Sequence, residues 1–431
     1  MKPILFYEYE TKNFDDLNIK DYQKRFLKSL SESLVPNKSI FTYSSDTISA
    51  TSIVGMISFD NVQIEILPKL LRRRGEEDGN SIIKNLMFML SYTNQLEISD
   101  SSISSMAKNF DSFLEAYISI FANRLAKQLR KCGSPKAYIE EESNLGALKG
   151  KIIFPKNLAQ NSFNHSKIYC GYNEFSANNP TSKAFKFVVS NLIKATRNST
   201  NQTVLNQCFA LLDGVSIEYV RPELLDHVPN AKRDPNFLAL LNLTKMFLRK
   251  MRPDFSGNRN EKVFSLLFDM NELFEEFIYA VIKNGNFNVY AEAQKQKRLV
   301  EKVRSIGEEW ENKSLFDTFT DITVTPVETK RPFIIDTKYK IVSGYRDGMK
   351  NPDVYQVLAY KQIHSKQDKI PPVILLYPKD SEDIRREYKV TDSDATFFAW
   401  TIDISRDLQR DFQAFKDELQ EFLNHFSGVA Y

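Results

Sequence analysis

Two aspartates and a lysine in the last third of the chain have the types and spacing to support metal-dependent hydrolysis. Fourteen residues separate Asp321 from Asp336, and Lys338 lies two positions further on. Side chains two apart on a strand share a face, and a paired strand could bring Asp321 to the same face. Mg²⁺ typically takes one or two protein carboxylates, with water and substrate phosphate as its other ligands. A neighbouring lysine could then orient the attacking water or stabilise charge on the phosphate.

The segments around these residues are predicted to form a hairpin. Residues 319–324 and 331–340 are rich in β-branched and aromatic side chains, and prolines indicate the connection between them. An incidental ion pair on a solvated hairpin would also explain the triplet that ends at Lys338. The apolar residues 333–335 favour an active site instead, because they predict a buried strand. Burying Asp336 there costs several kcal/mol unless it is paired or binds metal.

A predicted helix after the hairpin could support the site. Residues 353–361 have a helical pattern in which Gln356 and Tyr360 share a face. Both are candidate catalytic residues that would orient the lysine or the substrate. Ordinary core packing would also explain the helix.

A second predicted helix precedes the hairpin. Residues 266–277 have an amphipathic pattern that carries Glu275 and Glu276, either of which could be an extra acid. We take Glu275 as a candidate metal ligand. With Asp321, Asp336 and the backbone carbonyl of Thr337, it completes the predicted Mg²⁺ ligands.

The composition is that of a globular protein of near-neutral charge. Its 431 residues are 42% hydrophobic, enough for two or three domains. A formal net charge of +3 limits any nucleic-acid surface to a local patch. Three widely separated cysteines argue against a disulfide framework and against a zinc site. We expect a cytoplasmic protein, because neither a signal peptide nor a membrane span is recognisable.

Three regions are expected along this multidomain α/β chain. Residues 1–80 are predicted to form a small α/β module, and residues 81–256 a mainly helical region with an irregular interval at 138–179. Residues 257–431 are predicted to hold a mixed sheet flanked by helices, and a fragment beginning near residue 257 is expected to fold alone.

The N-terminal module has its own hydrophobic pattern. Residues 21–34 place apolar side chains on one helical face. Residues 53–59 and 62–67 are predicted to form a hairpin, with its isoleucines inward and Gln63 and Glu65 outward. The module contains no cluster of reactive side chains.

One stretch imitates a phosphate-binding loop. Residues 146–151 read Gly-Ala-Leu-Lys-Gly-Lys, but only three residues separate the glycines, and Ile152 stands where Ser or Thr should bind Mg²⁺. We therefore predict no nucleotide site in this chain. If nucleotide chemistry matters, another chain supplies it.

Several segments read together resemble the McrC family, the nuclease subunits of McrBC modification-dependent restriction systems. The resembling segments are, in order, residues 54–57, 63–69, 142–145, 148–152, 173–180 and 269–275, followed by the acid cluster. The cluster itself is similar to that of PD-(D/E)xK nucleases, and the helix with Gln356 and Tyr360 is similar to that of RecB-like members. Thr320 and Thr337 stand where the family often has Pro and Ala.

The resemblance implies a function. It implies a PD-(D/E)xK restriction-endonuclease-like domain in residues 257–431 and a Mg²⁺-dependent endodeoxyribonuclease that cuts double-stranded DNA in a bacterial or archaeal cytoplasm, directed by modified cytosine. It also implies docking on a McrB-like AAA+ GTPase hexamer, which binds the GTP and whose hydrolysis the chain stimulates. We expect residues 1–80 to be the docking element.

Two other functions stay open. One is a non-cleaving regulatory subunit that activates a AAA+ motor, although a degenerate nuclease usually loses an acid or the lysine. The other is a stand-alone nucleic-acid-binding protein, which would need a basic stripe. The nearest basic stripe comprises Lys295, Lys297, Arg298, Lys302 and Arg304.

Overall fold

The computed structural model describes residues 3–33, 35, 38–59, 62–71, 79–93, 113–164, 166–229, 231–250, 264–303, 306, 311–341, 349–364, 371–391 and 396–428. The chain is an α/β protein with two compact units. The first, Met1–Phe113 with Ser265–Tyr431, contains both ends of the chain, and the second, Leu114–Phe264, is continuous. The units therefore differ from the expected division at residues 80 and 256.

The N-terminal part of the first unit is built on a four-stranded sheet of order β1-β6-β5-β10. β1 runs parallel to β6, and β5 and β6 form the predicted hairpin. The strands are β1 (Ile4–Tyr7), β5 (Ile53–Phe59), β6 (Val62–Leu67) and β10 (Phe264–Asp269). Because β10 lies beside β5, the C-terminal region completes the N-terminal sheet, which explains the discontinuous unit.

A close approach between two backbones marks this junction. Gly55 on β5 has a φ of +126°, and a Cβ added to it would lie 1.9 Å from the carbonyl oxygen of Leu266 on β10. Only glycine can adopt this conformation and leave that space free.

Both faces of β6 are covered, contrary to the prediction that Gln63 and Glu65 point outward. All six residues of the strand are buried. The Gln63 amide donates a hydrogen bond of 3.2 Å to Glu65. The alternation of polar and apolar residues predicted one solvated face, and this prediction was wrong. β6 is an interior strand, and its polar side chains are buried because they hydrogen-bond to each other.

The remaining N-terminal elements surround this sheet. Helix α1 confirms the predicted apolar helical face, with Leu27 and Leu30 buried. These elements are β2 (Thr11–Asn13), η1 (Phe14–Leu17), α1 (Asp21–Ser33), β3 (Phe41–Tyr43), β4 (Thr47–Ala50) and α2 (Gly79–Tyr92). Helix α2 packs Phe88 against Phe277 and Phe412 of the C-terminal region, at ring distances of 6.3 and 5.0 Å.

The C-terminal part of the first unit is a six-stranded mixed sheet of order β11-β12-β13-β14-β16-β15. β13, β14 and β16 are parallel, and the other neighbours are antiparallel. Its elements are α9 (Met270–Asn284), β11 (Val289–Val303), β12 (Glu311–Pro326), β13 (Phe333–Thr337), α10 (Asn351–His364), β14 (Val373–Pro378), β15 (Arg385–Lys389), β16 (Thr396–Ile402) and α11 (Phe412–Ser427).

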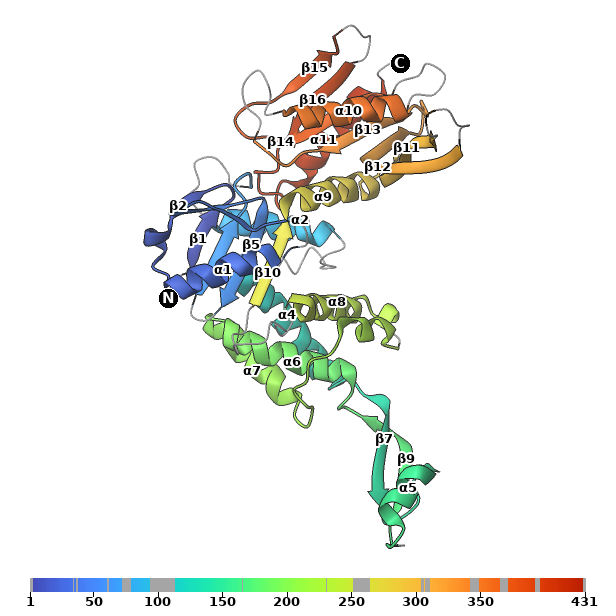
Figure 1. The fold of residues 1–431 in the computed structure, drawn as a ribbon. Coiled ribbons are helices and arrows are strands. Elements are labelled where there is room, and N and C mark those ends of the chain that lie inside the picture. Colours follow the sequence, from blue (N-terminus) through green and yellow to red (C-terminus); the bar gives the residue numbers. More distant parts are fainter. Residues whose placement is uncertain are drawn as a thin grey trace. The chain divides into compact units, whose positions relative to one another are not determined.

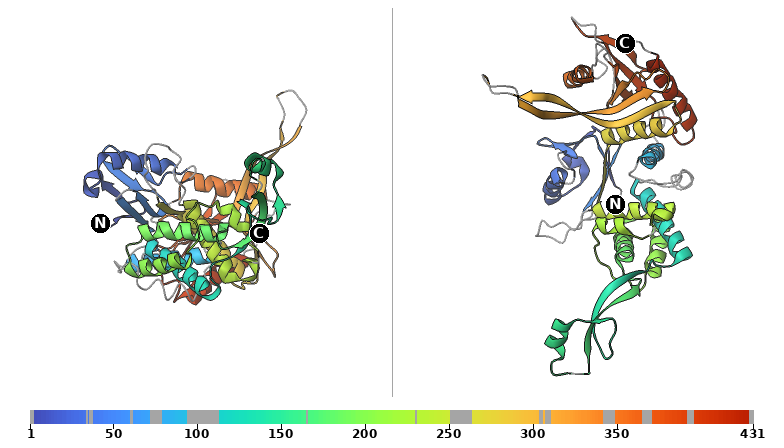
Figure 2. Two further views of the ribbon diagram at one scale, coloured as in Figure 1. Left: turned by 90° about the horizontal axis from the view of Figure 1, so that it is seen from below. Right: turned by 90° about the vertical axis from the view of Figure 1, so that its right-hand side faces the viewer.

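Helices cover both faces of this sheet, as Figure 2 shows. Val357 and Tyr360 of α10 pack on Ile334 of β13, whereas Phe426 of α11 packs on Phe333. Neighbouring strand residues point to opposite faces, so α10 and α11 lie on opposite sides. The buried strands β13 and β14 hold the elements of the candidate site in place.

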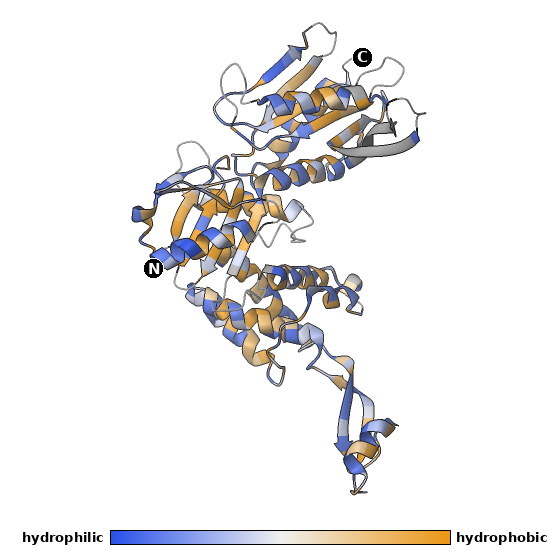
Figure 3. Ribbon diagram, viewed as in Figure 1, coloured by the Kyte–Doolittle hydropathy of each residue, from blue (hydrophilic) through white to orange (hydrophobic). Residues whose placement is uncertain are grey.

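The second unit is helical with a long hairpin (Figure 1). Its elements are α4 (Phe113–Cys132), β7 (Ala137–Leu145), β8 (Lys151–Ile152), α5 (Phe154–Asn161), β9 (Ile168–Ser176), α6 (Pro180–Ala195), α7 (Ser199–Leu211), η3 (Pro222–His227), η4 (Ala231–Arg233) and α8 (Pro235–Lys250). Residues 138–179, predicted to be irregular, instead form an antiparallel hairpin with a short helix. Figure 3 shows that these strands are mainly hydrophilic, unlike β5 and β6.

None of the helices within the described ranges combines the length and the apolar character needed to cross a membrane.

Candidate active site

Strands β12 and β13 bring Asp321 and Asp336 together at the expected hairpin. Their antiparallel register pairs Ile322 with Ile335, the residues next to the two acids. Asp336 has no exposed surface. One oxygen of Asp321, Oδ2, accepts hydrogen bonds from the backbone N–H and the hydroxyl of Thr337, at 2.8 and 3.0 Å. The strand pair therefore fixes the orientation of the first acid and buries the second.

Lys338 completes the cluster. Its Nζ lies 2.6 Å from Oδ2 of Asp336, and its side chain is only 18% exposed. The ammonium thus pairs with Oδ2, whereas Oδ1 of Asp336 has no hydrogen-bond partner within the part of the chain that the structure describes. A buried carboxylate oxygen without a partner is costly, which points to a ligand from outside the chain.

The cluster contains two carboxylates, Asp321 and Asp336, but only one ammonium group, that of Lys338. The pKa values of both carboxylates are raised. Burial and the nearby Asp321 raise the pKa of Asp336 to about 7. Burial also raises the pKa of Asp321, against the opposing effect of Lys338. Burial alone would lower the pKa of Lys338, but the two aspartates outweigh it and the pKa is raised. Lys338 therefore stays protonated. Its single positive charge cannot neutralise both aspartates when they are ionised, so the cluster favours binding of a further cation.

Glu275 of α9 stands beside this cluster. Asp269 caps the helix by accepting a hydrogen bond from the backbone N–H of Asn271, and the apolar face of α9 is buried. Burial and the proximity of Asp321 raise the pKa of Glu275 to about 7. Glu276, the alternative candidate, is exposed. Glu275 is thus near enough to Asp321 for their charges to interact, but among the described residues it does not join the two aspartates in a group of three that could hold a metal.

Gln356 and Tyr360 of α10 contact each other and the backbone of β12. The Gln356 amide donates to the Tyr360 hydroxyl at 2.5 Å, and that hydroxyl donates to the carbonyl of Phe319 at 2.7 Å. Burial, followed by the nearby Asp336, raises the pKa of Tyr360. Because the Tyr360 hydroxyl bonds to the chain two residues before Asp321, this pair holds the strand that carries the first acid.

Two further acids near the site were missed from the sequence. Asp353, at the start of α10, accepts from Lys340 Nζ at 2.6 Å and from the Lys350 backbone at 2.8 Å. Glu8 accepts from the hydroxyl of Tyr339 at 3.1 Å. The only sequence signal for Glu8 is a carboxylate directly after the apolar residues 4–7 of the first predicted strand.

The cluster fits a Mg²⁺ ion. No group of three or more His, Cys, Asp or Glu side chains in the described ranges is arranged to hold a metal. Mg²⁺ needs fewer protein ligands than that, since it usually keeps several waters. Oδ1 of the buried Asp336, which has no hydrogen-bond partner within the described residues, is a suitable hard donor.

The stretch that imitates a phosphate loop connects β7 to β8, which lie on opposite sides of β9. Gly150 has a φ of +73°, and an added Cβ would lie 2.4 Å from the Gly171 carbonyl oxygen. Lys149 lies over the Tyr172 ring at 3.8 Å, and Lys151 pairs with Glu140 at 3.2 Å. These glycines and lysines thus have roles within the hairpin. The side chains of the predicted basic stripe lie outside the described residues.

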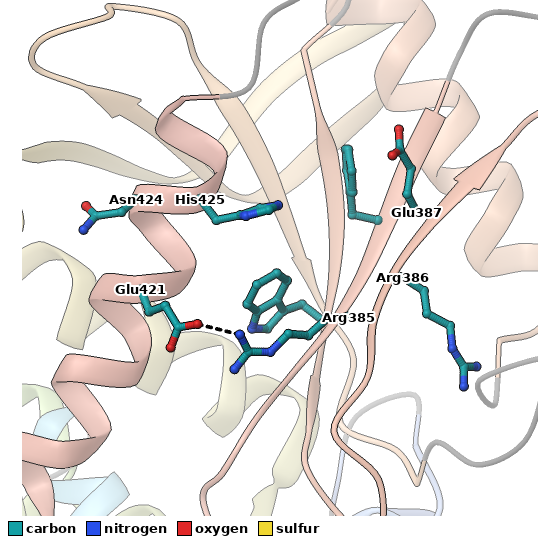
Figure 4. A pocket seen from close by; sticks show the side chains of 8 residues that line it. Arg385, Arg386, Glu387, Glu421, Asn424 and His425 are labelled. Atoms are coloured by element: carbon teal, nitrogen blue, oxygen red, sulfur yellow. Dashed lines mark hydrogen bonds and ion pairs between the residues drawn. The ribbon is translucent and has the colours of Figure 1, made fainter.

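A pocket of about 570 Å³ lies away from all the candidate residues. Figure 4 shows its lining on β15, β16 and α11. Arg385 stacks over Trp400 at 4.6 Å and pairs with Glu421 at 2.5 Å. The charge of Arg385 is already neutralised by Glu421, and we attribute the pocket to the packing of the edge strand β15 against α11.

Comparisons with known proteins identify the family. A curated relative, the type IV methyl-directed restriction enzyme EcoKMcrBC of Escherichia coli (strain K12), is 20% identical over 336 residues, which cover 72% of this chain and 90% of the relative. A refined half-complex from the tetradecameric assembly of Thermococcus gammatolerans McrB AAA+ hexamers with bound McrC contains a chain of similar fold. It has a TM-score of 0.67 and 18% identity, with 96% of this chain and 100% of that chain covered. A family model described as McrBC 5-methylcytosine restriction system component matches residues 48–378. Because that match spans most of the sequence, the chain belongs to the McrBC family of 5-methylcytosine restriction system components.

Proposed function

We propose that this chain is the McrC-like nuclease subunit of a restriction complex directed by modified cytosine. It is a Mg²⁺-dependent endodeoxyribonuclease with a PD-(D/E)xK-type C-terminal region, and its substrate is double-stranded DNA. The observation that carries the proposal is the cluster of Asp321, Asp336 and Lys338, in which Oδ1 of the buried Asp336 lacks a hydrogen-bond partner within the described residues.

Each residue of the cluster has a role in phosphodiester hydrolysis. Asp321, Asp336 and the backbone carbonyl of Thr337 would hold Mg²⁺, with Glu275 as a further acid. Bound Mg²⁺ supplies a Lewis acid that polarises the scissile phosphate and lowers the pKa of an attacking water. Lys338, whose pKa is raised, stays protonated, so it orients water and stabilises negative charge rather than removing a proton.

The same family supports a division of labour between two chains. The matched assembly combines McrB AAA+ hexamers with McrC. We infer that this chain likewise docks on a McrB-like AAA+ GTPase hexamer, which binds and hydrolyses the GTP.

The hairpin of the second unit is a better docking candidate than residues 1–80, the element expected from the sequence. Several large apolar side chains are exposed on it: Tyr138, Leu148, Phe154, Leu158, Phe163 and Phe175. Tyr138 and Phe175 form an exposed aromatic pair at 5.1 Å. Gathered apolar side chains at a surface usually mark an interaction site. The N-terminal sheet, in contrast, is completed by β10.

Docking can be assigned by comparing surface variants. Replacing Tyr138 and Phe175 together with Ser should abolish binding to the partner and stimulation of its GTPase. Leu224→Ser, at another exposed position of the same unit, should change neither, and Leu5→Ser tests the N-terminal module. Loss of stimulation by Leu5→Ser alone would return docking to residues 1–80.

The catalytic assignment is tested by Asp336→Asn and Lys338→Ala. Each should lower cleavage of modified DNA by at least about 100-fold, with Mg²⁺, GTP and the partner present. Both should still stimulate the partner's GTPase. Glu328→Gln, an exposed carboxylate in the turn between β12 and β13, is the control and should cleave normally. Cleavage by either cluster variant at the wild-type rate would refute the assignment of this cluster as the active site. A wild-type chain that never cleaves would favour the alternative of a non-cleaving regulatory subunit.

A further inference from the structure

One residue inside a strand has a backbone conformation that strands do not use. Gln294 of β11 has a φ of +48°. The other described non-glycine residues with positive φ lie in turns or connections: Tyr9, Asn18, Asn286, Asn288 and Lys330. The left-handed conformation costs an L-residue roughly 1–2 kcal/mol. Such strain persists where the surrounding structure enforces it, often at functional sites.

The position of this residue connects it to the candidate site. In the pairing of β11 with β12, Ala293 is opposite Ile322 and Lys295 is opposite Thr320, so Gln294 lies across from Asp321. The Gln294 amide donates a hydrogen bond of 3.2 Å to Oε1 of Glu275. The strained residue therefore bonds to the acid that stands beside the aspartate pair.

We infer that Gln294 is a positioning residue that holds the Glu275 carboxylate beside Asp321 and thereby strengthens cation binding. The inference rests on the proposed function. The left-handed backbone presents the carboxamide to α9, where it donates a hydrogen bond to Oε1 of Glu275 and so fixes the position of that carboxylate. A negative charge held at this place attracts a divalent cation even where it is not a direct ligand. Outer partners of this kind typically change metal affinity by roughly 10- to 100-fold when they are removed.

Gln294→Gly separates this role from a structural one. Glycine adopts positive φ at little cost, so the variant should unfold at the wild-type temperature or higher. Its calorimetric Kd for Mg²⁺, measured on the full chain without DNA, should nevertheless rise by about tenfold. The Mg²⁺ concentration for half-maximal cleavage should rise by the same factor, and the rate at saturating Mg²⁺ should change little.

A double-variant cycle shows whether the effect passes through Glu275. Glu275→Gln combined with Gln294→Gly should bind Mg²⁺ no more weakly than Glu275→Gln alone. Additive effects, or an unchanged Kd in Gln294→Gly, would overturn the inference. Asp336→Asn distinguishes this from failure of the proposed function. If Asp336→Asn abolishes cleavage while Gln294→Gly behaves as wild type, only the inference about Gln294 fails. If Asp336→Asn cleaves normally, the proposed function itself fails, and the inference about Gln294 fails with it.

Discussion

The proposed Mg²⁺ site should bind its cation in a way that depends on pH, because its acids are buried. Burial raises the pKa of both Asp336 and Glu275 to about 7. Carboxylates must be ionised to bind a cation, so protons compete with Mg²⁺ below that pH. We expect Mg²⁺ affinity to rise between pH 6 and pH 8, by up to about tenfold per pH unit for each proton released. Calorimetry in buffers of different ionisation enthalpy measures both the Kd and the protons released, and an affinity independent of pH would contradict the assignment.

Glu8 should make stability depend on pH in the opposite sense to an ordinary surface acid. Burial raises its pKa to about 8, and Oε1 has no hydrogen-bond partner within the described residues. The unfolded chain ionises near pH 4 to 5 and the folded chain only near pH 8, so this group lowers stability as pH rises through that window.

The Glu8→Gln variant isolates this contribution. The glutamine oxygen can still accept from Tyr339 and Lys69. The variant should match wild type at pH 5 and exceed it at pH 9 by about 2–4 kcal/mol. Denaturant unfolding of both proteins at the two pH values gives the comparison. Equal differences at pH 5 and pH 9 would show that Glu8 ionises normally.

For single residues, the sequence predicts contacts only between partners that are near each other in the chain. Asp321, Asp336 and Lys338 lie within one hairpin, so their spacing is sufficient to predict that they meet. Glu8 bonds to Tyr339, more than 300 positions away, and Gln294 is recognised by its φ. Neither a long-range contact nor a strained backbone leaves a local pattern in the sequence.

Elements were predictable where apolar residues recur at a regular helical or strand period in the sequence. Helix α1 and the hairpin of β5 and β6 have such patterns, and both are confirmed. β7 has neither a buried face nor an alternating pattern, because most of its residues are partly or fully exposed. The interval of residues 138–179 therefore could not be recognised as a hairpin. For β6 the error was the opposite one: its alternating pattern predicted a solvated face, but the strand is buried throughout.

The contact of β5 with β10 gives a prediction at the level of elements. Gly55→Ala would place a methyl group against the Leu266 carbonyl, so one strand must move. We expect a loss of at least about 3 kcal/mol in the free energy of unfolding. Gly133 also has a positive φ, but its added Cβ would meet nothing within 4 Å. Gly133→Ala is thus a control for strain without a clash, with an expected cost of about 1 kcal/mol. Similar losses in chemical denaturation would mean that the backbones do not approach this closely.

The organisation of the whole chain was only partly predictable. Length and composition indicate two or three domains, and the second compact unit, Leu114–Phe264, begins well after residue 81, where the helical middle region was expected to start. The discontinuity could not be predicted, because nothing near Ile53–Phe59 shows that its neighbouring strand is Phe264–Asp269. Pairing between distant strands is decided by packing in the folded protein.

Fragments should follow the observed units rather than the boundary expected at residue 257. Residues 114–264 should fold alone and melt cooperatively by circular dichroism. A fragment of residues 257–431 should not, because β10 would lose β5 and α9 would lose α2. Co-expression with residues 1–113 should restore it. A protease-resistant C-terminal fragment that forms on its own would contradict this organisation.

The place of β10 also has a consequence during synthesis on the ribosome. Until that strand emerges, β5 remains an open edge, the kind of surface on which unfinished chains associate. Roughly 200 residues separate Phe59 from Phe264, so translation at about 5–20 residues per second leaves the edge exposed for about 10–40 s. To avoid aggregation during that interval, growing chains therefore need either a chaperone that covers the edge or slow association with one another. The same delay means that the N-terminal sheet cannot be completed before Asp269 has been synthesised.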